Sequence, residues 1–281
     1  MMLYRSTVNE CIKIALKPRT YLGFGALSLL VGVILFALKS DGTSFISFAT
    51  ASFEQTLSFQ GAVLNGNLVG FIIMQMLIIH VPLLVTLVTG DVVSGEAATG
   101  TLRMIATKPV SRTTLLMSKF LAGALYTVLI VSWFAFLSIV VARLLFGDGD
   151  MVVLNSDGLV ILPHTDILWR YGGALLVALL SLLTVSTLSI CLSVFTDNSI
   201  GPIVATMAVV ILFTIIGSLD VHVFDSVRPL LFTTHMAAWR SFFELSVPFD
   251  DIRESVSILL AQNVIVVSVA LYAFSRKDIT T

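Results

Sequence analysis

The sequence contains two long apolar segments, GGALLVALLSLLTVSTLSICLSVF (172–195) and GPIVATMAVVILFTIIGSL (201–219), joined by TDNSI (196–200). A helix needs roughly 20 residues, at about 1.5 Å each, to cross the hydrocarbon of a bilayer. The linking residues allow only a tight turn, and Pro202 suits the first turn of the second helix. The two segments therefore predict a pair of antiparallel membrane-spanning helices.

The whole chain has a composition that agrees with this prediction. Of its 281 residues, 57% are hydrophobic and 12% are charged, whereas a soluble domain has roughly 25% charged residues. Lipid must therefore cover much of the surface. No basic stripe indicates nucleic-acid binding, and the two cysteines, Cys11 and Cys191, are too few for a disulfide framework.

Six segments in all are long and apolar enough to span. They lie at about 20–38, 68–89, 114–145, 172–195, 201–219 and 256–274. The sequence thus predicts an all-α membrane protein, a single transmembrane domain over 1–281, with a connecting segment at 90–112 and a longer loop at 220–255.

The distribution of charge predicts the orientation. The segments 1–19, 90–119, 196–200 and 275–281 together carry ten Lys or Arg and five acidic residues, and the rest of the chain carries six and twelve. Lys and Arg are retained on the cytoplasmic side of a membrane. Both termini and the 90–112 segment are therefore expected on the cytoplasmic side of the cell (inner) membrane, and 220–255 on the opposite side.

The first 19 residues predict an amphipathic helix that ends near Pro18. Its polar face carries Glu10, Lys13 and Lys17, and its apolar positions are Val8, Cys11, Ile12, Ala15 and Leu16. Two interpretations are open. The helix either lies in the membrane interface or docks on a cytoplasmic partner.

The 90–112 segment is the most informative part of the chain. Gly95 and Gly100 have the spacing of a phosphate-binding loop, but Thr101 occupies the position of the required lysine, so nucleotide binding is excluded here. Apolar residues within this charged segment indicate a protein contact. The alternative is a loop packed beneath its own helices.

The same segment resembles the permease subunits of ABC-2-type ABC transporters. Those proteins have a glutamate four residues before Gly-Thr-Leu, then a Pro-Val-Ser-Arg-like run, then a lysine at the start of the third span. The matching residues here are Glu96, Gly100, Thr101, Leu102, Pro109, Val110, Ser111, Arg112 and Lys119. The motif covers about residues 90–123, and the predicted topology resembles the family along the whole chain.

The resemblance implies the type-2 exporter permease architecture, with two permease copies, expected as a homodimer, pairing with two copies of a separate ABC-type ATPase. ATP and Mg²⁺ would bind that ATPase, and this chain would bind no cofactor and catalyse nothing. The 90–112 segment would be a coupling helix, with the interface residues Asp91, Glu96, Gly100, Thr101, Leu102, Arg103, Pro109 and Arg112. The family exports drugs, peptides, polysaccharides and lipids, and one branch serves nitrous-oxide-reductase maturation. The sequence does not distinguish among these substrates.

Gln75, His80 and Pro82 form a second candidate site, a pathway or gate within the predicted second span. Ionisable side chains at membrane depth are costly and indicate function by default. A structural role is the alternative, because proline leaves backbone carbonyls without partners and His80 can bond to one of them.

Two other classes of function would also suit a chain with several membrane spans: an ion-coupled secondary transporter and an intramembrane enzyme. An ion-coupled secondary transporter would show repeats and a charged site at the midplane, and an intramembrane enzyme would need paired catalytic groups. The sequence shows no internal repeat, no metal-ligand pattern and no hydrolase or metalloprotease motif. A transport subunit that depends on a separate ATPase is therefore the leading expectation.

Overall fold

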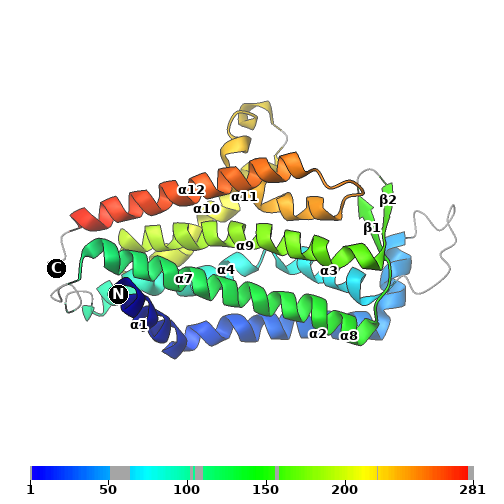
Figure 1. The fold of residues 1–281 in the computed structure, drawn as a ribbon, viewed down its shortest axis with the longest axis horizontal. Coiled ribbons are helices and arrows are strands. Elements are labelled where there is room, and N and C mark those ends of the chain that lie inside the picture. Colours follow the sequence, from blue (N-terminus) through cyan, green and yellow to red (C-terminus); the bar gives the residue numbers. More distant parts are fainter. Residues whose placement is uncertain are drawn as a thin grey trace.

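The computed structural model describes residues 2–50, 64–101, 104, 110–155, 158–219 and 221–277, with the backbone alone at 43–50, 154–155 and 158–159. The described chain forms an elongated helical bundle with both termini at one end (Figure 1). A short antiparallel hairpin, β1 (Met151–Asn155) and β2 (Gly158–Leu162), lies at the other end.

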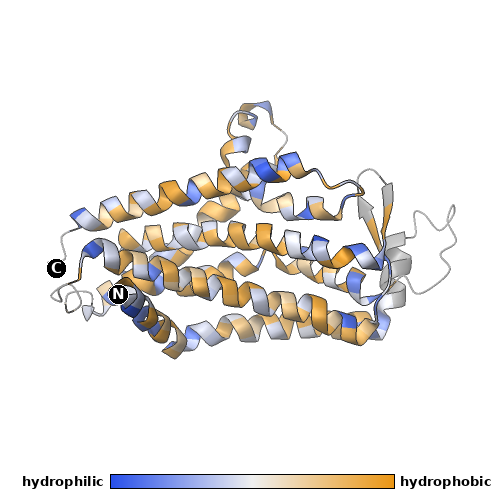
Figure 2. Ribbon diagram, in the orientation of Figure 1, coloured by the Kyte–Doolittle hydropathy of each residue, from blue (hydrophilic) through white to orange (hydrophobic). Residues whose placement is uncertain are grey.

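Within the described residues, six helices are long and apolar enough to cross a membrane, which confirms the predicted all-α membrane class. They cover Pro18–Gly42, Val81–Ala98, Arg112–Phe146, His164–Val194, Gly201–Ser218 and Phe249–Arg276. Apolar residues lie along the outer surfaces of these helices (Figure 2), where lipid rather than water can cover them.

Local sequence signals explain several helix ends. The N-terminal helix α1 (Met2–Leu16) stops before Pro18, where α2 (Pro18–Thr50) begins, as predicted. The Ser111 side chain accepts a hydrogen bond from the Thr114 amide and caps α7 (Arg112–Ala135). Pro202 lies in the first turn of α10 (Gly201–Ser218), also as predicted.

The central helix is α9 (His164–Val194). It packs against α7 and α10 and also against α4 (Val81–Thr89), α5 (Asp91–Ala98), α12 (Phe249–Arg276) and η4 (Ala237–Phe243). Its neighbour α7 continues through a π-helical turn, η1 (Phe136–Val141), into α8 (Ala142–Phe146). The last helix, α12 (Phe249–Arg276), returns the chain to the end where it began (Figure 1).

The predicted second span differs most from expectation. Residues 66–98 form three helices, α3 (Gly66–Leu77), α4 (Val81–Thr89) and α5 (Asp91–Ala98), with a break at 78–80. The apolar spanning stretch is Val81–Ala98, so the chain stays helical and buried where the sequence predicted a loop to begin at residue 90. Gly90 has helical dihedral angles, which is why α4 leads into α5 without a turn.

The predicted 220–255 loop also differs. Its described residues form η2 (His222–Phe224), η3 (Arg228–Leu230), α11 (Phe232–Met236) and η4 (Ala237–Phe243), and α12 already begins at Phe249. Trp239 and Phe243 are buried in the bundle against Phe71 of α3. Residues 231–243 therefore pack partly into the bundle, whereas 221–230 remain at its surface.

Candidate functional site

The candidate site lies at the end of the bundle that holds both termini, where α1 and α5 meet the first turns of α7 (Figure 1). The four segments that the charge tally assigned to one side of the membrane all reach this end. Lys277 pairs with Asp197 of the α9–α10 turn at 2.8 Å, and Arg112 donates to the carbonyl oxygens of Ser275 and Lys277. The tally thus grouped these segments correctly.

A closed ring of four charged side chains forms the centre of the site. Lys119 Nζ lies 2.9 Å from Glu10 Oε2 and 2.7 Å from Glu96 Oε2. Lys13 Nζ lies 2.6 Å from Glu10 Oε1 and 2.7 Å from Glu96 Oε1. Each carboxylate therefore bridges both ammonium groups, and the ring joins α1, α5 and α7.

Lys119 is the deepest member of this ring. Its side chain is fully buried, and its ammonium also donates to the carbonyl oxygen of Val92 at 2.9 Å. The ammonium thus donates hydrogen bonds to Glu10 and Val92 and forms an ion pair with Glu96. An unpaired charge at this depth would cost several kcal/mol, about 3–5 kcal/mol when one partner of a buried pair is removed, so the ring holds together as a unit.

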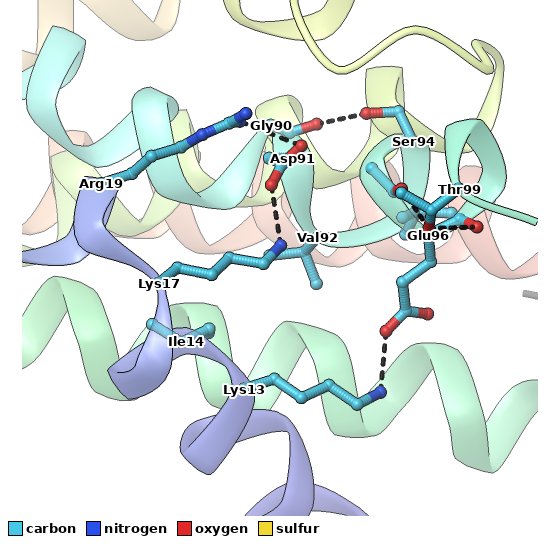
Figure 3. A network of polar contacts seen from close by, with 12 residues as sticks. Lys13, Ile14, Lys17, Arg19, Gly90, Asp91, Val92, Ser94, Glu96 and Thr99 are labelled. Atoms are coloured by element: carbon cyan, nitrogen blue, oxygen red, sulfur yellow. Dashed lines mark hydrogen bonds and ion pairs between the residues drawn. The ribbon is translucent and has the colours of Figure 1, made fainter. Parts of the chain in front are cut away.

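Lys13 is the more exposed cation of the ring, with 41% of its side chain exposed against 0% for Lys119. Figure 3 shows its contact with Glu96. Burial alone lowers the pKa of its ammonium, but its hydrogen bonds to Glu10 and Glu96 outweigh that effect and raise the pKa above the ordinary value. Lys13 consequently remains charged throughout the physiological range.

A second ion-pair group lies beside the ring. Asp91, at the start of α5, contacts Lys17 Nζ at 2.7 Å and Arg19 Nη1 at 3.0 Å (Figure 3). Asp91 is buried, and both cations come from the junction of α1 and α2. The two acidic residues of α5 are therefore each held by basic residues of the N-terminal segment.

Ser193 of α9 fixes the backbone of α5 from the opposite side. Its Oγ accepts hydrogen bonds from the amides of Val93 and Ser94 at 3.2 and 2.8 Å, and it donates to the Gly90 carbonyl oxygen at 2.7 Å. Free amides at a helix N-terminus need such acceptors. The helix α5 is thus attached to α9 on one side and to α1 on the other.

The structure shows how α1 is oriented. Glu10 and Ile14 are buried against the bundle, whereas Val8, Ile12 and Leu16 are exposed on the outer side. Glu10 thus faces the bundle, and several apolar side chains face outward. This arrangement is compatible with both interpretations of α1, since either lipid or a partner would cover those side chains.

The remaining predicted coupling residues lie beyond the ring. Thr101 is partly exposed, and Gly100 has a φ of +71°, a left-handed conformation that glycine adopts without strain. Leu102, Arg103 and Pro109 lie outside the described residues. An open groove of about 560 Å³ lies between α1, α5 and Ser199 of the α9–α10 turn, with Thr99 and Thr101 at its edge.

The second candidate set lies elsewhere, at the break between α3 and α4. His80 Nδ1 lies 3.0 Å from the carbonyl oxygen of Met76, which is the backbone contact that the structural interpretation predicted. Pro82 occupies the first turn of α4, and Gln75 is exposed on α3. Nothing in the geometry joins these residues to the charged ring.

Sequence reasoning missed the key position in the ring. Lys119 was expected at the cytoplasmic start of a span, yet it is fully buried, and its partner Glu10 lies 109 residues earlier. A lysine followed by the apolar run from Phe120 was the available signal. Among the described residues, no group of three or more His, Cys, Asp or Glu side chains could hold a metal ion.

Comparison with curated proteins found no match. Comparison with protein families found one that is described as a protein of unknown function, DUF2705, matching residues 27–280. This range covers nearly all of the chain, from the first spanning helix to the C-terminal tail. The chain therefore belongs to the DUF2705 family.

Proposed function

We propose that this protein is the permease subunit of an ABC transporter of the ABC-2 type, which exports its substrate across the cell membrane. Two copies would pair with two copies of a separate ATPase that binds ATP and Mg²⁺. Both termini and the ring would face the cytoplasm. The protein itself would perform no catalysis and would hold no cofactor.

The observation that carries the proposal is the buried ring of Glu10, Lys13, Glu96 and Lys119. The ring ties α5, the first part of the 90–112 segment that resembles a coupling helix, to α1 and to the third spanning helix. Asp91 and Glu96, predicted to contact the ATPase, are thus buried in ion pairs within the chain. Arg112, at the other end of that segment, is hydrogen-bonded to the end of α12. A force applied between residues 99 and 111 would thus reach three spanning helices at once.

The proposed transmission needs a stiff connection, and this is the role we assign to the ring. Ion pairs in water contribute about 0–1 kcal/mol, but buried ones cannot exchange their partners for water. A displacement of α5 would therefore carry Lys119 and α1 with it. Ser193 would transfer the same displacement to α9, since it bonds α5 at three backbone positions.

Crosslinking to an ABC-type ATPase of the same cells tests the proposal. In a Cys11→Ser, Cys191→Ser background, we expect Met104→Cys, which is exposed at the ring end, to crosslink to the ATPase. Ile161→Cys, exposed on the hairpin at the opposite end, is the matched control and should not crosslink. Equal crosslinking at both positions, or none at Met104→Cys in a folded complex, would overturn the proposal.

An ion-coupled secondary transporter is the alternative, and the pairing of acidic residues disfavours it. Within the described residues, the buried carboxylates are those of Glu10, Asp91 and Glu96. Each of the three contacts two cationic side chains. A carboxylate held in this way is poorly suited to bind and release a transported proton or sodium ion.

A further inference from the structure

A cavity of about 370 Å³ lies midway along α9, remote from the charged ring. The α3–α4 break forms one wall, through Ile78, Ile79 and Pro82, and the short helices α11 and η4 form the wall that faces it. The far end of α10 lines a further side, from Val210 to Ser218, and the cavity is partly open. The break between α3 and α4 thus borders this space.

The lining is apolar in effect. Besides its aliphatic and aromatic side chains, it includes the hydroxyls of Ser181, Thr214 and Ser218. Each of these hydroxyls donates its proton to a carbonyl oxygen of its own helix, at 2.9, 2.7 and 2.9 Å respectively. Their hydrogen-bonding capacity is therefore largely used, and such a wall suits a hydrocarbon chain.

Two polar groups at the cavity remain available for a ligand. Thr233 Oγ1 is buried without a hydrogen-bond partner. The guanidinium of Arg240 lies 5.7 Å from the ring centroid of Trp239, and no carboxylate of a described residue lies within ion-pair distance of it. Arg240 is exposed at the edge of the cavity, so its guanidinium is accessible to an acidic group of a ligand whose chain lies inside.

The size of the cavity limits the class of ligand. Cavities for small molecules span roughly 300–1,000 Å³, so this one is at the lower end and is better matched to one hydrocarbon chain than to the two of a phospholipid. We infer that the cavity binds a single-chain anionic amphiphile, such as a long-chain carboxylic acid. Its chain lies between α4, α9 and α10, and its acidic group contacts Arg240.

This inference deepens the proposed function by naming a substrate class. It rests on the proposed function only for the claim that the bound amphiphile is the exported substrate. Binding itself needs no ATPase. Absence of ligand binding to the isolated chain would therefore leave the ATPase crosslinking result unaffected. Absence of the crosslink would equally leave the ligand-binding result unaffected.

Quenching of Trp239 fluorescence provides the test, because this side chain lines the cavity. In a Trp133→Phe, Trp169→Phe background, the purified chain in detergent is titrated with dibromostearic acid and, separately, with its uncharged methyl ester. We expect saturable quenching by the acid and binding of the ester weaker by roughly tenfold or more, as loss of a charge-assisted contact implies.

Variants complete the test. Arg240→Gln should weaken binding of the acid by a similar factor, Arg240→Lys should restore most of it, and Arg253→Gln, exposed on α12, should have no effect. Gly217→Leu should block the cavity, since a Cβ there meets only Thr234 Oγ1, at 3.3 Å; Thr214→Phe is a second blocking variant if the first fails to fold. Equal binding of acid and ester, tighter binding of brominated phosphatidylglycerol, or quenching unchanged in both blocking variants would overturn the inference.

Discussion

Lys119 and Glu96 form a 2.7 Å ion pair between α7 and α5 in which the lysine side chain has no exposed surface. The pair closes the ring that also contains Glu10 and Lys13. Because the ring is charge-balanced and buried, removing one member leaves an uncompensated charge on the others. Its consequences for stability are therefore larger than those of the surface pairs.

We predict that Lys119→Met destabilises the folded chain by about 3–5 kcal/mol, the usual cost of breaking a buried pair. Thermal unfolding in detergent measures the change. The control is Arg253→Gln, which removes an exposed pair with Asp250 at 3.6 Å and should cost under about 1 kcal/mol. Similar losses in the two variants would show that the ring contributes no more than a surface contact.

Close packing of α3 on η1 leads to a second prediction. A Cβ added at Gly70 would lie 2.5 Å from the backbone carbonyl oxygen of Ser138, whereas one at Gly32 would meet nothing within 4 Å. Gly70→Ala should therefore cost about 1–3 kcal/mol through overpacking. Gly32→Ala should be neutral or slightly stabilising, since alanine favours helix. Unfolding midpoints that rank the two variants in the opposite order would contradict the packing described here.

A hydrogen-bonded clamp joins α9 to α12. Asn263 Nδ2 donates to Thr184 Oγ1 at 2.7 Å, and Thr187 Oγ1 donates to Asn263 Oδ1 at 2.9 Å. Hydrogen bonds between helices in membranes contribute about 0.6 kcal/mol on average and rarely exceed 1.7 kcal/mol. We expect Asn263→Leu to fall within that range by thermal unfolding. Ser268→Ala, which removes only a bond to the helix's own Val264 carbonyl, should show no loss.

Cys11 gives a pH-dependent prediction. Burial raises the pKa of its thiol, and the neighbouring Glu10 carboxylate raises it further. Since the thiolate is the reactive form, alkylation of Cys11 in a Cys191→Ser background should be slow near pH 8. Its rate should rise with pH to a midpoint above the ordinary value of about 8.5. The same variant in denaturant should show the ordinary midpoint, and identical folded and unfolded profiles would rule out the effect.

The sequence predicted what depends on local composition. Hydrophobicity predicted six apolar helices, and Pro202 located the start of α10. The hairpin at 151–162 was also within reach, because MVVLN and GLVIL are rich in β-branched and aliphatic residues and flank a short turn.

Features that depend on distant residues could not be predicted in this way. The burial of Lys119 depends on two carboxylates from other helices. The burial of Phe243, beside Trp239, depends on side chains of α3 and α9. The continuation of α4 into α5 depends on Ser193, 103 residues from the Gly90 carbonyl it contacts. No window of sequence contains these partners.

The buried Glu10 of α1 imposes an order on biogenesis. This helix is synthesised before its partner, because the buried ammonium that contacts Glu10 belongs to a residue translated 109 positions later. The full set of contacts around Glu10 therefore forms only once α7 has been synthesised, so an early part of the chain reaches its final packing late.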